Sequence, residues 1–169
     1  MTTNNNSQHY DVYRVEKLLQ SFSSYINSFD GSPHAFANAE TIMSEVFHKD
    51  WIFMTDDGPK DLQWYRNFCK SFAEHGSIAK VLNFSQTENG NIQVTIENTI
   101  NGVEVDPITY DGLVSIDENG QYTIKYFEPV IIKDNNKSRS FEPFDKNLRN
   151  VEKMIQLVSD CDSCSPSKD

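Results

Sequence analysis

Alternation of apolar and polar residues between Asn91 and Glu128 is the feature that most limits how this chain can fold. Apolar side chains recur at every second position in two runs: Ile92, Val94 and Ile96, then Val114, Ile116, Tyr122, Ile124 and Tyr126. Such alternation is typical of strands with one buried face. The pairs Asn101-Gly102 and Asn119-Gly120 supply residues that tolerate a positive φ, as tight hairpins require. The segment therefore predicts a curved antiparallel sheet.

Three amphipathic helices are predicted ahead of this sheet, because apolar residues recur at spacings of three and four. They run from Val12 to Asp30, from Ser32-Pro33 to His48, and from Leu62 to Gly76. Ser32 is expected to cap the second helix, with Pro33 at its first position, and Gly76 to cap the end of the third. The apolar run at residues 51–54 predicts a strand between the second and third helices.

The 169 residues suit a single domain with one hydrophobic core. We expect a polar tail over residues 1–9, an α+β domain over 10–132, a loop over 133–144, a C-terminal helix over 145–159 and a second polar tail over 160–169. The last helix carries an apolar face, so it should dock on the domain.

Composition narrows the classes of partner. The chain has 25 acidic and 15 basic residues and a formal charge of -10, which opposes binding to nucleic acids and to anionic membranes. The N-terminus lacks the pattern of a secretory signal, and no apolar run is long enough to span a bilayer. Three cysteines form no disulfide framework. We therefore expect a cytoplasmic protein.

Cys161 and Cys164 have the C-x-x-C spacing of redox motifs and zinc half-sites. They stand in a polar tail, without the βαβ context of a redox motif or a second pair of zinc ligands. Phosphate-binding glycine loops and metalloprotease motifs do not occur in the sequence. We predict no cofactor and no metal.

The order of the predicted elements is similar to that of the superfamily named after nuclear transport factor two, which includes SnoaL-like polyketide cyclases, ketosteroid isomerases and scytalone dehydratase. The resemblance covers about residues 10 to 130 and rests on the segments SYINSFDG, AETIMSEVFHKDWIFMTDDGP, LQWYRNFCKSF and SIDENGQYTIKYFEP. It implies a cone-shaped α+β fold, in which the sheet wraps around helices and encloses an apolar pocket. It also implies dimerisation through the outer face of the sheet.

The resemblance does not extend to all the catalytic residues of the isomerases. Phe22 stands where the isomerases have a tyrosine, and Gly112 where they have a protonated aspartate. Asp56 and Asp57 lie near the position of the isomerase base, although turn formation and helix capping explain both residues as well. We therefore do not transfer isomerase activity to this chain.

Parity on the strands supports two of the candidate site residues, Asn98 and Glu128. Asn98 shares the phase of Ile92, and Glu128 shares that of Tyr122, so both are expected to face the core. A partly desolvated carboxylate has a raised pKa, as a general acid or base requires. The candidate catalytic residues are Glu128, Asp57 and Tyr110, and the candidate ligand-binding residues are Tyr25, Phe53, Trp64, Tyr65, Asn98 and Tyr126.

Two functions remain open at this point. The first is binding of a small apolar molecule, with cofactor-free isomerase, cyclase or dehydratase chemistry in which Glu128 or Asp57 is the base and a tyrosine the proton donor. The alternative is a non-catalytic, dimeric protein-interaction module. An open pocket with convergent Tyr and Glu side chains would favour the first, and an aromatic-filled interior the second.

Overall fold

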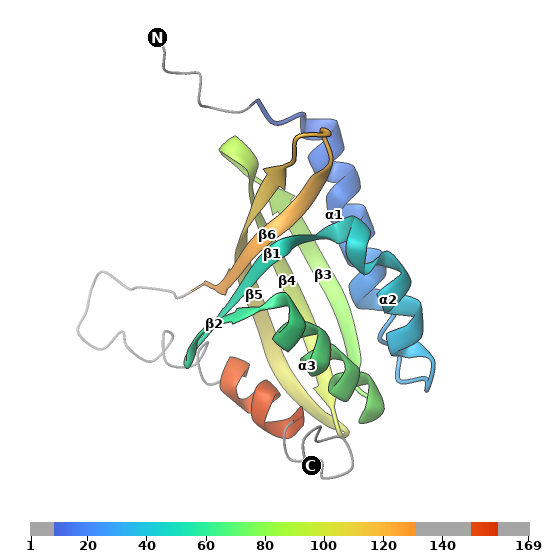
Figure 1. The fold of residues 1–169 in the computed structure, drawn as a ribbon. Coiled ribbons are helices and arrows are strands. Elements are labelled where there is room, and N and C mark those ends of the chain that lie inside the picture. The colour runs from blue at the N-terminus through green and yellow to red at the C-terminus, as the bar shows by residue number, and fades with distance from the viewer. Residues whose placement is uncertain (1–8, 131–149, 159–169) are drawn as a thin grey trace, which may run out of the picture.

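The computed structural model describes residues 9–130 and 150–158 (Figure 1). Its elements are α1 (Val12–Asn27), α2 (Ala35–Val46), β1 (Phe47–Thr55), β2 (Gly58–Asp61), α3 (Leu62–Glu74), β3 (Ile78–Gln86), the 3₁₀ turn η2 (Glu88–Gly90), β4 (Asn91–Ile100), β5 (Val103–Ile116) and β6 (Tyr122–Pro129). Residues 150–158 form a further helix. Residues 1–8 of the first predicted tail, the loop over 133–144, the rest of the predicted C-terminal helix, the second tail and the pair Cys161 and Cys164 lie outside the described residues.

The six strands form one curved sheet in the order β2-β1-β6-β5-β4-β3. All neighbouring pairs are antiparallel except β1 and β6, which run parallel. Helices α1 and α3 lie along one side of this sheet (Figure 1). The predicted α+β class and the curved sheet around the N-terminal helices are thus confirmed, with one parallel pair added.

The hairpin between β4 and β5 has the predicted turn. Asn101 and Gly102 have φ values of 55° and 76°, and Ile100 pairs directly with Val103. Positive φ at both central residues is the geometry of a type I′ turn, whose twist matches that of the flanking strands. This turn joins the two longest strands of the sheet, which contribute Ile96, Asn98 and Tyr110 to the candidate site.

Helix α3 begins and ends with specific caps. The Asp61 carboxylate accepts a hydrogen bond of 2.9 Å from the backbone N–H of Trp64. At the other end Gly76 has a φ of 70°, and the N–H groups of Gly76 and Ser77 donate to the carbonyls of Ala73 and Phe72. This is a Schellman motif, so the predicted role of Gly76 in closing the helix is confirmed.

Two local predictions differ from the structure. Helix α2 begins at Ala35, because Ser32 and Pro33 lie in a turn in which the Ser32 carbonyl accepts from the Ala35 N–H. The prediction of a single strand between the second and third helices was also incomplete, because residues 58–61 form the short edge strand β2 against β1. Edge strands tolerate proline when its missing N–H points away from the ladder.

The core is unusually rich in aromatic rings. Phe22 of α1 packs edge-to-face on Phe47 and Phe127, and Trp51 lies 5.1 Å from Phe127 between ring centroids. Such pairs add about 0.5–1.5 kcal/mol beyond their burial. These aromatic rings pack beneath the candidate site.

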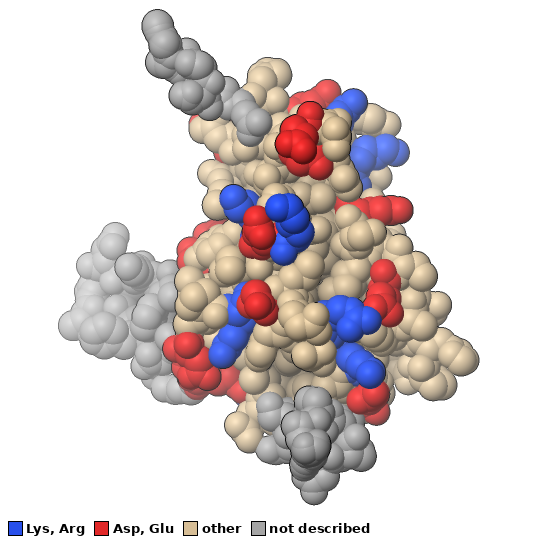
Figure 2. Space-filling view, in the orientation of Figure 1, with Lys and Arg blue, Asp and Glu red and all other residues tan. Residues whose placement is uncertain are grey.

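On the molecular surface, acidic and basic side chains are interspersed over the face shown in Figure 2.

Strand β6 contains an irregularity that decides which way its side chains point. Leu113 and Val114 are consecutive on β5, but their partners on β6 are Tyr126 and Ile124. Lys125, which lies between these two partners, is therefore an extra residue on β6. A bulge of this kind shifts the alternation by one position. The side chain of Phe127 faces the core, at 2% exposure, and Tyr126 and Glu128 face the opposite side. The prediction that Tyr126 and Glu128 face the core was therefore wrong.

Candidate functional site

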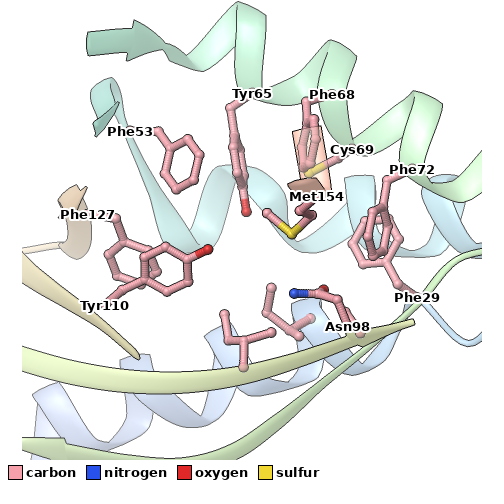
Figure 3. Close-up of a pocket in the computed structure, with 13 residues that line it drawn as sticks. Phe29, Phe53, Tyr65, Phe68, Cys69, Phe72, Asn98, Tyr110, Phe127 and Met154 are labelled. Carbon is pink, nitrogen blue, oxygen red and sulfur yellow. The ribbon is translucent and has the colours of Figure 1, made fainter. Parts of the chain in front are cut away.

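An apolar cavity lies between α1, α3 and the inner face of the sheet, and the C-terminal helix 150–158 contributes one residue to it (Figure 3). The space that a water-sized molecule can enter is about 40 Å³. Its lining residues are Ile26, Phe29, Phe53, Tyr65, Phe68, Cys69, Phe72, Ala79, Ile96, Asn98, Tyr110, Phe127 and Met154. The walls are thus mainly aromatic and aliphatic.

Three polar groups converge on this cavity. Figure 3 shows the hydroxyl ends of Tyr65 and Tyr110 and the carboxamide of Asn98 turned toward the same space. Asn98 is 4% exposed, and its carboxamide is the one amide side chain in the lining among the described residues. Burial raises the pKa of both tyrosines. Both are therefore neutral hydrogen-bond donors at ordinary pH.

Cys69 links the cavity to helix α1. The hydroxyl of Tyr25 donates a hydrogen bond of 3.1 Å to the Cys69 sulfur. Burial raises the pKa of the thiol to about 12, although hydrogen bonds with Tyr25 and Tyr65 oppose this rise. A thiol with so high a pKa is protonated, so Cys69 acts here as an apolar wall rather than as a nucleophile.

The structure brings together four of the predicted site residues, which are Phe53, Tyr65, Asn98 and Tyr110. Their positions follow from the regular alternation of β4 and β5 and from the helical stripe of α3. Tyr25 lies behind Cys69 and does not line the cavity. Trp64 stacks on Phe68 at 5.4 Å between ring centroids and is likewise outside the lining.

The two predicted carboxylate bases lie away from the cavity. Glu128 is on the outer face of the sheet, where it accepts a hydrogen bond from Tyr126. Asp57 belongs to the turn between β1 and β2, where its backbone N–H donates to the Thr55 hydroxyl. It lines a separate surface groove beside residues 152–156 of the C-terminal helix.

Several cavity residues escaped the sequence analysis. Phe68, Cys69 and Phe72 were recognised as one helical stripe but not as a wall of the site, which their spacing from Tyr65 could have indicated. Phe127 was missed because the bulge at Lys125 reverses the expected phase. Met154 could not be placed, since only tertiary structure shows where its helix docks.

The position of Gly112 explains what replaces the isomerase aspartate suggested by the resemblance. A Cβ atom on Gly112 would lie only 2.7 Å from Cε1 of Phe127 and 3.0 Å from Cγ1 of Ile92. Phe22, at the tyrosine position, is fully buried among other rings. Apolar groups therefore fill the space at both positions where the isomerases have a tyrosine or a protonated aspartate.

Three further features of the described residues concern a metal site, a membrane-spanning helix and a second groove. Within residues 9–130 and 150–158, no three His, Cys, Asp or Glu side chains are grouped as a metal site would need. The same residues contain no helix long and apolar enough to cross a membrane. A groove of about 480 Å³ between α2, α3 and the β5–β6 turn is larger than the cavity, but it is open and lined by charges such as the paired Arg66 and Glu40.

Comparison with known proteins supports the fold. No family model and no curated protein matches the sequence. Among solved structures, an NTF2-like protein of unknown function from Pseudomonas aeruginosa is 12% identical, with a TM-score of 0.50 over 71% of this chain and 98% of its own. A candidate ketosteroid isomerase from Shewanella frigidimarina is 8% identical, with a TM-score of 0.51 over 69% and 94% of the two chains.

A protein of unknown function from Mycobacterium tuberculosis is 13% identical, with a TM-score of 0.51 over 87% of this chain and 93% of its own. At such low identity these similarities bear on fold alone. They agree with the α+β architecture and the curved sheet described above. The chain therefore has the NTF2-like fold.

Proposed function

We propose that this domain binds a small, uncharged, largely apolar molecule that carries a hydrogen-bond acceptor such as a carbonyl oxygen. The observation that carries the proposal is the carboxamide of Asn98, which is 4% exposed and is turned into an otherwise apolar cavity (Figure 3). Leaving such a group unsatisfied when a ligand fills the cavity costs about 1–3 kcal/mol. A ligand oxygen placed against it would avoid that cost.

The chemistry of the walls supports the same class of ligand. Tyr65 and Tyr110 are neutral. The Tyr110 hydroxyl can donate to an acceptor oxygen, whereas the Tyr65 hydroxyl already bonds to Cys69. The lining contains no Lys, Arg, Asp or Glu side chain among the described residues, so a charged ligand would enter without a counterion. The remaining lining is hydrocarbon and sulfur, which suits an apolar body.

Binding is better supported than acid/base catalysis. The titratable groups in the cavity are Tyr65, Tyr110 and Cys69, and burial raises the pKa of each. All three are therefore proton donors rather than bases near neutral pH. Glu128 and Asp57 do not line this cavity, so neither is placed to abstract a proton from a molecule within it.

Titration with small ketones tests the proposal. Acetone and cyclopentanone are added to isotopically labelled protein, and the NMR shifts of the Met154 and Ile96 methyl groups report occupancy. Asn98→Leu should weaken acetone binding about two- to tenfold, as the loss of one hydrogen bond predicts. Gln93→Leu is the matched control, because Gln93 is an exposed amide on the outer face of the same strand. Equal acetone affinity in the wild type, Asn98→Leu and Gln93→Leu, or no binding to any of them, would reject the proposal. The Asn98 carboxamide would then bond to water rather than to a ligand.

We also propose a homodimer formed through the outer face of the sheet, as in the interaction-module alternative. Leu113 on β5 is 45% exposed and lies directly opposite Tyr126 on β6. The small size of the cavity favours this second role, since ligand pockets usually enclose about 300–1,000 Å³. Light scattering coupled to size exclusion should give twice the chain mass, and Leu113→Asp should reduce it to the monomer. Val103→Asp, at the exposed hairpin end, is the control.

A further inference from the structure

The C-terminal helix presents three apolar side chains to the domain. Val151, Met154 and Val158 are spaced three and four residues apart and are between 1% and 4% exposed. The carbonyl of Leu157 accepts a hydrogen bond of 3.5 Å from the side chain of Asn101 in the β4–β5 turn. The helix is therefore attached to the end of the sheet at more than one point.

Only one of these three side chains reaches the cavity. Met154 lines it, whereas Val151 and Val158 do not. In Figure 3 the Met154 thioether is drawn between Tyr65 and Phe72, in the same space toward which Asn98 is turned. Methionine is unbranched and has three rotatable bonds, which makes it suited to filling an irregular space.

We infer that Met154 determines the size of the ligand that the cavity accepts. The side chain occupies the space into which the apolar part of a larger ligand would extend, and it leaves about 40 Å³ beside the polar groups. This inference rests on the proposed function, because it assigns a size limit to the same uncharged, oxygen-bearing ligand. Asn98 and Tyr110 bind the oxygen, and Met154 excludes bulk.

Shortening Met154 tests the inference. We expect Met154→Ala to bind cyclohexanone about tenfold more tightly than the wild type does, while acetone affinity changes less than twofold. Val158→Ala is the matched control, since it removes a buried apolar side chain from the same helix without touching the cavity. If Val158→Ala and Met154→Ala give the same profile across acetone, cyclopentanone and cyclohexanone, Met154 merely holds the helix and the inference is wrong.

Two additions keep the outcomes separate. Met154→Val shortens the side chain less, so it should raise cyclopentanone affinity even if the alanine variant does not fold. Benzene has no acceptor oxygen, and engineered apolar cavities of about 150 Å³ take it up. Benzene binding to Met154→Ala, with ketone binding unaffected by Asn98→Leu, would support the size limit and reject the proposed ligand oxygen. Unchanged benzene and cyclohexanone binding in both Met154 variants would overturn the size limit itself.

Discussion

The hydroxyl of Tyr126 donates a hydrogen bond of 2.8 Å to Oε1 of Glu128, two residues further along the same strand. Both side chains lie on the outer face of the sheet. Partial burial, together with the nearby carboxylate, raises the pKa of Tyr126 to about 12. A tyrosine and a carboxylate that alternation predicted inside the cavity thus form a local pair outside it.

Replacing Glu128 with Gln should lower the pKa of Tyr126 toward its ordinary value near 10, because the amide carries no negative charge to oppose the phenolate. Tyrosinate absorbance, or the NMR shift of the Tyr126 ring, measures the change. Glu118→Gln, in the exposed β5–β6 turn, should leave this pKa unaltered. The acetone affinity of Glu128→Gln should also equal that of the wild type. A marked loss of affinity would mean that Glu128 takes part in ligand binding.

Replacing Asn98 with Leu should stabilise the fold by about 1–3 kcal/mol, because it replaces a polar amide in an apolar wall with hydrocarbon of similar size. Urea denaturation measures the free energy of unfolding. The substitution would then gain stability at the expense of ligand affinity, as is common at binding sites. A loss of stability would mean that the carboxamide is satisfied, for example by bound water.

Replacing Gly112 with Ala should destabilise the protein by about 1–3 kcal/mol, the usual cost of overpacking a core. The new methyl group would collide with the ring of Phe127. Combining Gly112→Ala with Phe127→Leu creates space and should recover part of the loss, so the double variant should be more stable than the two single effects added together. Additive effects would show that the two residues do not compete for the same volume.

Stability should fall at alkaline pH. The thiol of Cys69 ionises near pH 9 in the unfolded chain, and burial raises its pKa to about 12 in the folded protein. Its contribution is therefore complete below pH 9 and is lost as the pH rises from 9 toward 12, by about 1.4 kcal/mol per pH unit. Tyr25, Tyr65 and Tyr110 add the same trend above pH 10.

Between pH 9 and 10 the thiol acts before the tyrosines, which allows its share to be measured. Urea midpoints at pH 8.5, 9.5 and 10.5 should fall less steeply for Cys69→Ala than for the wild type over the first interval. Parallel curves for the two proteins would show that the thiol ionises equally easily in both states, contrary to its burial.

The sequence was sufficient to predict the sheet, three helices and four of the thirteen residues that line the cavity. Alternation holds without interruption on the inward face of β4 from Ile92 to Ile100, so Asn98 could be placed correctly. The same holds for Tyr110 on β5, because the irregularity between β4 and β5 lies near Asp106 and Pro107, ahead of it. Local pattern and final structure agree where pairing is regular.

The remainder depended on information that no local pattern contains. Nothing in the residues around Lys125 distinguishes a bulge from a regular strand, and one extra residue moved Glu128 to the other face. The docking of Met154 depends on how the last helix meets the cavity, which is a long-range contact. Apolar stripes indicate that a helix packs, but they do not indicate against what.

The parallel pairing of β1 with β6 has a consequence for synthesis on the ribosome. Phe53 pairs with Phe127, so β1 gains its second neighbour only after almost the whole domain has been translated. A two-stranded hairpin such as β1–β2 is barely stable alone in water, and contacts between distant residues slow folding. A nascent chain that stops before Tyr122 should therefore remain a substrate for chaperones rather than form a smaller domain.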